Sequence, residues 1–111
     1  MADIKEVVDS IKDDALKAVK DQLADLLNSA ENDTNDVIRG IGKKVGNWLL
    51  MRARGELSDS ELEALLYSSD QTLRQYKNTI NIEVRARCEK IAVELVNLVL
   101  DKIVGIATHA P

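Results

Sequence analysis

The sequence predicts an all-α protein: a helical hairpin or bundle with a long C-terminal helix, completed by self-association. Apolar residues recur at intervals of three and four along most of the 111 residues, which is the spacing of one face of a helix. The apolar residues are almost all aliphatic, with no Phe, one Trp and two Tyr, as suits packed helices. Neither glycine nor proline occurs between residues 56 and 104, so strong turn signals are absent there.

The length fits a single domain, residues 1–111, with one modest core. The N-terminal sequence MADIKEVVDS lacks the basic start, the apolar run and the cleavage site of an export signal, which predicts a cytoplasmic location. Cys88 is the only cysteine, so an internal disulfide and a multi-cysteine metal site are excluded. Its place on an apolar stripe predicts a reduced, partly buried thiol.

Residues 1–30 are predicted to form an acidic amphipathic helix, with apolar residues on one side and Asp and Lys on the other. Residues 31–36 form the clearest loop, because their short polar side chains compete with the helix for backbone hydrogen bonds. Thr34, Asn35 or Asp36 is expected to cap the helix that follows.

A basic helix that contains three glycines is predicted over residues 37–55. Gly40, Gly42 and Gly46 should each cost about 1 kcal/mol relative to alanine. Three explanations stay open: a second helix packs closely against Gly42 and Gly46, the start of the helix is frayed, or the backbone makes a functional contact there. Gly55 is predicted to end this helix.

A capped helix and a long C-terminal helix are predicted to share residues 58–106. Ser58-Asp59-Ser60-Glu61 forms a capping box at the start. The two helices are expected near 59–68 and 70–106, or as one continuous helix. Residues 107–111 form a tail.

Residues 79–88 are compatible with two kinds of secondary structure, a helix or a strand. Apolar and polar residues alternate strictly there, which is typical of a half-buried strand. The helix is favoured, because a lone strand would leave its hydrogen bonds unpaired. A helix, however, would leave Ile82 exposed.

Residues 91–107 are apolar around most of the helix circumference, apart from a strip of Glu94, Asn97 and Asp101. The run contains too many charged residues to be a membrane span. If it stayed exposed to water, the protein would lose about 1.5–3 kcal/mol of burial free energy per large aliphatic side chain. A chain of this size offers few helices to cover it, so a second copy is predicted to do so. The predicted self-association residues are Ile91, Leu95, Val96, Val99, Leu100 and Ile103.

Catalysis is not predicted, and neither is a cofactor or a metal. His109, the only histidine, is the third residue from the end, where an ordered site is not expected. The glycine-rich sequence 40–46 fails the spacing of both the dinucleotide and the Walker phosphate loops. Aspartates on one flank of the first helix are explained as a solvated face, because a hard cation needs several converging oxygens.

Charge is unevenly distributed along the chain. Residues 37–55 hold five basic residues and no acid, residues 1–36 hold ten acids and four lysines, and the formal net charge is −4. The basic segment either pairs with the acidic first helix in a hairpin or binds something outside the chain. The candidate partner-binding residues are Arg39, Lys43, Lys44, Trp48, Arg52 and Arg54.

The preferred function is therefore a small non-catalytic interaction or assembly protein that forms a homo-oligomer. The alternative is a peripheral binder of anionic surfaces, either a membrane or an acidic protein, through residues 37–55. Nucleic acid is disfavoured by a pI near 5.0 and by the few aromatic residues available for stacking. The sequence specifies neither the partner, nor the pathway, nor the number of subunits.

Overall fold

The computed structural model describes residues 4–11, 17–76, 78 and 81–104, and all the regular secondary structure among them is helical. The elements are α1 (Ile4–Ser10), α2 (Lys17–Glu31), α3 (Asp36–Ala53), α4 (Asp59–Tyr76), α5 (Ile82–Arg87), η1 (Cys88–Val93), α6 (Glu94–Leu98) and η2 (Val99–Val104). The last four run on without a break as one C-terminal rod, in which η1 and η2 are π-helical. The all-α prediction is confirmed for this part of the chain.

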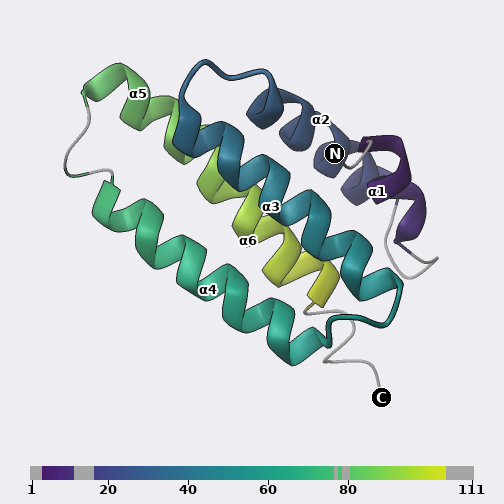
Figure 1. The fold of residues 1–111 in the computed structure, drawn as a ribbon. Helices are drawn as coiled ribbons and strands as arrows, with labels where there is room; N and C mark the ends of the chain where they lie inside the picture. Colours follow the sequence, from purple (N-terminus) through teal and green to yellow (C-terminus); the bar gives the residue numbers. More distant parts are fainter. Residues whose placement is uncertain (1–3, 12–16, 77, 79–80, 105–111) are drawn as a thin grey trace.

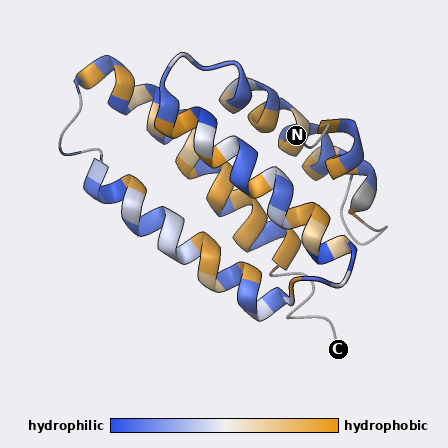
Figure 2. Ribbon diagram, viewed as in Figure 1, coloured by the Kyte–Doolittle hydropathy of each residue, from blue (hydrophilic) through white to orange (hydrophobic). Residues whose placement is uncertain are grey.

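The helices form an elongated bundle of 42 × 24 × 23 Å. In Figure 1, α3 lies between α2 and α4, and the C-terminal rod runs behind α3. The rod packs on α2, α3 and α4, whereas α1 lies against α2 and α3. In Figure 2 the rod is largely hydrophobic, while the outward turns of α3 and α4 are more hydrophilic. The most apolar segment of the chain is thus the centre of the bundle.

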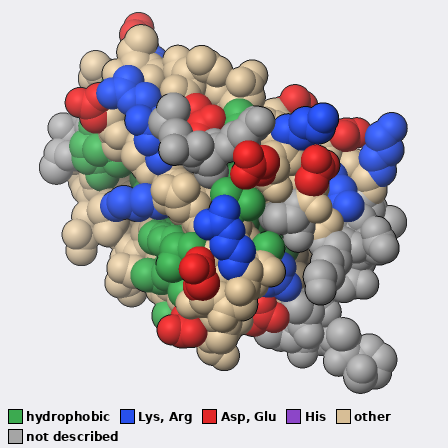
Figure 3. All heavy atoms as spheres, turned by 45° about the vertical axis from the view of Figure 1, so that its right-hand side comes forward, with side chains coloured by type: hydrophobic (Ala, Val, Ile, Leu, Met, Phe, Trp, Pro, Cys, Tyr) green, Lys and Arg blue, Asp and Glu red, His purple; other side chains and the backbone are tan. Residues whose placement is uncertain are grey.

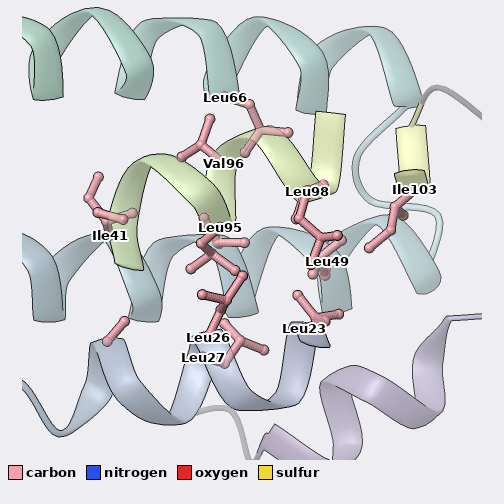
Figure 4. Packing of buried hydrophobic residues seen from close by; sticks show 14 of the residues in the cluster. Leu23, Leu26, Leu27, Ile41, Leu49, Leu66, Leu95, Val96, Leu98 and Ile103 are labelled. Atoms are coloured by element: carbon pink, nitrogen blue, oxygen red, sulfur yellow. The ribbon is translucent and has the colours of Figure 1, made fainter. Parts of the chain in front are cut away.

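Aliphatic side chains from four directions meet in this centre (Figure 4). Leu27 of α2, Leu49 of α3, Leu66 of α4 and Leu95 of α6 are all buried. The Cys88 thiol is buried in the same core and is not part of a disulfide. A core of branched aliphatic residues follows from the aliphatic composition, because such side chains interdigitate between packed helices.

The apolar face of the C-terminal helix is covered by the chain itself. The residues predicted for self-association are either fully buried (Leu95, Val96, Val99), 4% exposed (Ile103) or partly buried (Ile91, Leu100). The premise that one chain has too few helices to cover this face does not hold, because α2, α3 and α4 all pack against the rod. The chain's own helices thus cover most of the surface of these residues, and self-association stays a prediction.

The predicted helix over residues 1–30 is divided into α1 and α2. Ala30 of α2 lies against Gly42, and Val7 of α1 lies against Gly46 one turn further along α3. In a straight helix Val7 and Ala30 would be about 35 Å apart at 1.5 Å per residue. The chain therefore folds back between them, so that Val7 is buried on α3. Residues 12–16, between the two helices in the sequence, lie outside the described residues.

The helix that begins at Asp59 ends later in the chain than the break predicted near residues 68–70. Ser68, Ser69 and Asp70 lie inside α4, which continues to Tyr76. Asp70 forms a 2.9 Å ion pair with Arg74 on the following turn. A run of polar residues at these positions is therefore compatible with the helix, and its Asp70 side chain pairs within the same helix.

The helix that follows begins at Ile82, with Asn81 as its N-cap. The Asn81 side chain accepts the backbone N–H of Val84 at 2.9 Å. Residues 82–88 are helical, which decides against the strand for that part of 79–88, and Ile82 is 78% exposed as the helix requires. Residues 79 and 80 lie outside the described residues.

The predicted helix caps are confirmed at the start of α3, at its end and at the start of α4. Asn35 accepts the backbone N–H groups of Val37 and Ile38 and caps α3. Gly55 has φ +78°, a left-handed conformation that glycine adopts without a steric penalty. Ser58 and Glu61 exchange reciprocal hydrogen bonds of 3.0 and 3.1 Å at the start of α4.

Glu61→Gln is expected to destabilise the protein at neutral pH and to lose this effect in acid. Hydrogen bonds from Ser58, first its backbone N–H and then its side chain, lower the pKa of Glu61 below 4.5. A lowered pKa in the folded state stabilises the fold above about pH 4.5, and the stabilisation disappears as the pH falls through the folded-state pKa. Urea unfolding of wild type and variant from pH 7 to pH 3 would show the two curves converging. Glu56→Gln, an exposed acid outside the helix, is the control, and a difference that stays constant with pH would contradict the prediction.

Candidate interaction site on the outer face of α3

Helix α3 is held in the bundle by one side and presents the other side to solvent. Its buried residues are Ile38, Ile41, Gly42, Val45, Gly46 and Leu49. They fall at intervals of three and four and thus share one face. The opposite face holds Lys43 and Lys44, and Arg54 lies on the same side just beyond the end of the helix, whereas Arg39 and Arg52 lie closer to the buried face. We call this opposite face the outer face.

Three of the predicted basic residues are exposed: Lys43, Lys44 and Arg54. Within the part of the chain that the structure describes, none of the three forms a side-chain hydrogen bond or an ion pair. Their positive charge is therefore available to a group from outside the chain.

The other two basic residues are neutralised within the chain. Arg39 pairs with Asp36 on the preceding turn and also donates to the backbone oxygen of Asp33 at 3.3 Å. Arg52 pairs with Asp59 at the start of α4. These two arginines help to fix α3 in place and contribute little free charge to its surface.

The acidic first helix is not the partner of the basic segment in the described residues. Although α2 and α3 pack as a hairpin, the acids that pair with Arg39 and Arg52 belong to α3 and α4. The hairpin contact is instead apolar and close, as the approach of Ala30 to Gly42 shows. Close helix packing thus accounts for Gly42, one of the glycines whose role the sequence left open.

Trp48 is partly buried and packs against the hydrophobic core. A side chain held in this way is not free to insert into a membrane, which was the role considered for it in the peripheral binder. Of the six candidate residues, Lys43, Lys44 and Arg54 are thus the ones that are exposed and have no ion pair with any described residue.

The outer face also contains residues that the sequence analysis did not select. Leu50 and Met51 are partly buried against the core, as Trp48 is, but they lie among the cations on the outer side of the helix, where Asn47 is exposed. The sequence could have indicated them, because positions 43, 47, 50 and 54 are spaced by three or four residues and therefore lie on the polar side of α3. A pattern of charged residues alone does not identify these uncharged positions.

A second polar cluster joins the α2–α3 loop to α4 and α5. The Asp33 side chain is 5% exposed and accepts hydrogen bonds from Arg87 Nε at 3.1 Å and from the Asn35 backbone N–H at 2.8 Å. The Asn35 side-chain amide donates to the Tyr76 hydroxyl at 3.0 Å. The cluster lies at one end of the bundle. Because both oxygens of the Asp33 carboxylate accept hydrogen bonds from protein groups, we assign the cluster a structural role.

The surface and the remaining side chains give no sign of another kind of site. On the face shown in Figure 3, basic and acidic side chains are interspersed, and apolar side chains reach the surface between them. No three His, Cys, Asp or Glu residues of the described segments are placed to hold a metal ion together. His109 lies outside those segments. Among the helices that the structure describes, none has the length and apolar character needed to cross a bilayer.

Comparison with models of known protein families, with curated protein sequences and with solved structures finds no match for this chain. The functional argument therefore rests on the outer face of α3 itself.

Proposed function

We propose that this protein is a non-catalytic helical interaction protein that binds an acidic surface of another protein through the outer face of α3. The observation that carries the proposal is the contrast along one helix. Arg39 and Arg52 are neutralised by acids of the chain, whereas Lys43, Lys44 and Arg54 are exposed and, in the described residues, without an acidic partner.

The packing of α3 supports this role. The helix contacts α1, α2, α4 and η1, so the three cations stand on an element that is fixed from several sides. A rigid element loses little conformational entropy when a partner binds, which favours affinity. Charges at the rim of such a surface chiefly steer the encounter and select the partner.

An acidic protein is a better fit than a lipid bilayer. Helices that lie on membranes expose a continuous apolar face, whereas the apolar face of α3 is in the core and Trp48 packs against it. Nucleic acid is disfavoured because the chain has a formal net charge of −4, and nucleic-acid binding relies on an extended basic surface. Self-association through residues 91–107 forms no part of the proposal, because the described part of that face is covered.

The test is binding of a labelled oligo-glutamate peptide, followed by fluorescence anisotropy at low and high salt. The variant Lys43→Glu with Lys44→Glu and Arg54→Glu is expected to bind at least about tenfold more weakly, a loss of about 1.4 kcal/mol. The matched control reverses three exposed lysines on other elements, Lys17, Lys90 and Lys102. It changes the net charge equally and should bind like wild type.

Three results would count against the proposal. Equal loss in the control would mean that net charge alone matters, and absence of binding by the wild type would remove the acidic partner. Binding to phosphatidylserine vesicles but not to the peptide would assign the face to membranes. Thermal melts of all three proteins verify that each variant remains folded.

A further inference from the structure

Gly40 has no packing role within the described chain. A Cβ at Gly42 would lie 2.7 Å from the Ala30 Cβ, and a Cβ at Gly46 would touch Val7 at 3.6 Å, but a Cβ at Gly40 would meet nothing within 4 Å. Gly40 also has an ordinary helical conformation, since Gly55 is the one described glycine with a positive φ. Glycine inside a helix costs about 1 kcal/mol relative to alanine, and at Gly40 no contact of the fold offsets this cost.

Gly40 lies on the same face as the unpaired cations. Gly40, Lys44, Asn47 and Met51 follow one another at intervals of four, three and four residues, so they form one line along α3 that is about 16 Å long. Gly40 is partly exposed and Asn47 is exposed, and neither position carries a bulky side chain on this line. Lys43, Leu50 and Arg54 flank the line, which combines positive charge with two partly exposed apolar side chains.

We infer that the occupant of the outer face is an acidic amphipathic helix of the partner protein, packed along α3 with its closest approach at Gly40. This inference rests on the function proposed above and names the form of the acidic partner. Its carboxylates pair with Lys43, Lys44 and Arg54, and its apolar side chains cover Leu50 and Met51.

Helix packing explains the features that charge alone leaves unexplained. Two helices pack with their axes 8–10 Å apart, the distance depending on the side chains at the contact, so a position without a side chain permits the closest approach. A flexible acidic segment would use the cations equally well but would gain nothing from the open backbone at Gly40. An amphipathic helix in a surface groove or seam is also a common form of peptide recognition.

The first arm of the test compares two labelled peptides of identical Glu, Leu and Ala composition. In one peptide the leucines fall on a single helix face, and in the other they are distributed around the helix. The amphipathic peptide is expected to bind the wild-type protein at least about tenfold more tightly, although both peptides carry the same charge. The Met51→Gln variant is expected to reduce this difference, because Met51 belongs to the apolar part of the contact.

The second arm uses Gly40→Leu, which places a side chain at the position where an added Cβ meets nothing within 4 Å in the described chain. Leucine is the better helix former, so the melting temperature should stay the same or rise while binding of the amphipathic peptide falls at least about tenfold. Ala64→Leu, an exposed position on α4, is the matched control and should bind normally. Loss of binding without loss of stability is a result that misfolding cannot produce.

The two proposals fail in different ways. If both peptides bind equally in a manner that depends on the three cations, and Gly40→Leu has no effect, the helical occupant is refuted while the acidic partner stands. If neither peptide binds, or if vesicles alone bind, both proposals are refuted.

Discussion

Val96→Asp is expected to unfold the isolated chain. Val96 has no exposed surface and lies on α6 opposite Leu66 of α4 (Figure 4). The substitution removes a buried aliphatic side chain, a loss of about 1.5–3 kcal/mol, and places a carboxyl group where water cannot reach it, which costs at least several kcal/mol more. The combined loss is comparable to the whole stability of a small domain, about 5–15 kcal/mol.

Circular dichroism with urea titration would measure this effect. We expect the variant to lose its cooperative transition or to unfold at a much lower urea concentration. Asn97→Asp is the matched control, since it adds the same charge one residue along at an exposed position, and it should unfold like wild type. A variant of Val96 that stays folded at wild-type stability but halves its mass in light scattering would contradict the prediction and indicate a subunit interface.

Local signals in the sequence were sufficient for the helices whose ends are capped. Asn35 and the Ser58–Glu61 capping box are each decided by residues within one turn, so their effect can be read without knowledge of the fold. The burial of α6 was also predictable, because Glu94, Asn97 and Asp101 mark the one exposed strip. The helices that cover it were not.

Tertiary packing decided what the local signals could not. A helix over residues 1–30 is consistent with its periodicity, but α3 has only 18 residues and a straight partner would extend beyond it. Folding back buries Val7 and Ile11 instead. The break before Ile82 uses neither glycine nor proline, and its signal, the capping residue Asn81, is recognised only once the long helix is known to turn.

The sequence predicted which basic residues the candidate site contains, but not which of them form ion pairs within the chain. Sequence reasoning selected all five basic residues of α3 and its end, yet ion pairs depend on which acids the fold brings near. Asp59 reaches Arg52 because α4 packs back along α3. Arg52 is therefore neutralised, whereas no described acid pairs with Lys44. The spacing of Gly42 and Gly46 allowed close packing as one of three explanations, and only the structure shows that Gly42 lies against Ala30 of α2 while an added Cβ at Gly40 would meet nothing within 4 Å.

Gly42→Ala is the second substitution with a large expected effect. The new methyl group would lie 2.7 Å from the Cβ of Ala30 and 3.5 Å from the backbone nitrogen of Glu31. Ala30 has no side-chain torsion by which to move away, so α2 and α3 must separate. Such overpacking costs about 1–3 kcal/mol, more than the roughly 1 kcal/mol that alanine gains as a helix former. We expect a net destabilisation of about 1–2 kcal/mol by urea unfolding.

Gly40→Ala is the internal control, because it makes the same chemical change in the same helix where a Cβ meets nothing within 4 Å. It should stabilise the protein by about 1 kcal/mol, so the two substitutions are expected to have opposite signs. Adding Ala30→Gly to Gly42→Ala removes the methyl group that is struck and should restore part of the lost stability. Two neighbouring groups that share one space are coupled in this way, whereas independent sites are additive. Additive effects in this cycle, or a stabilising Gly42→Ala, would show that the helices do not approach each other at this point.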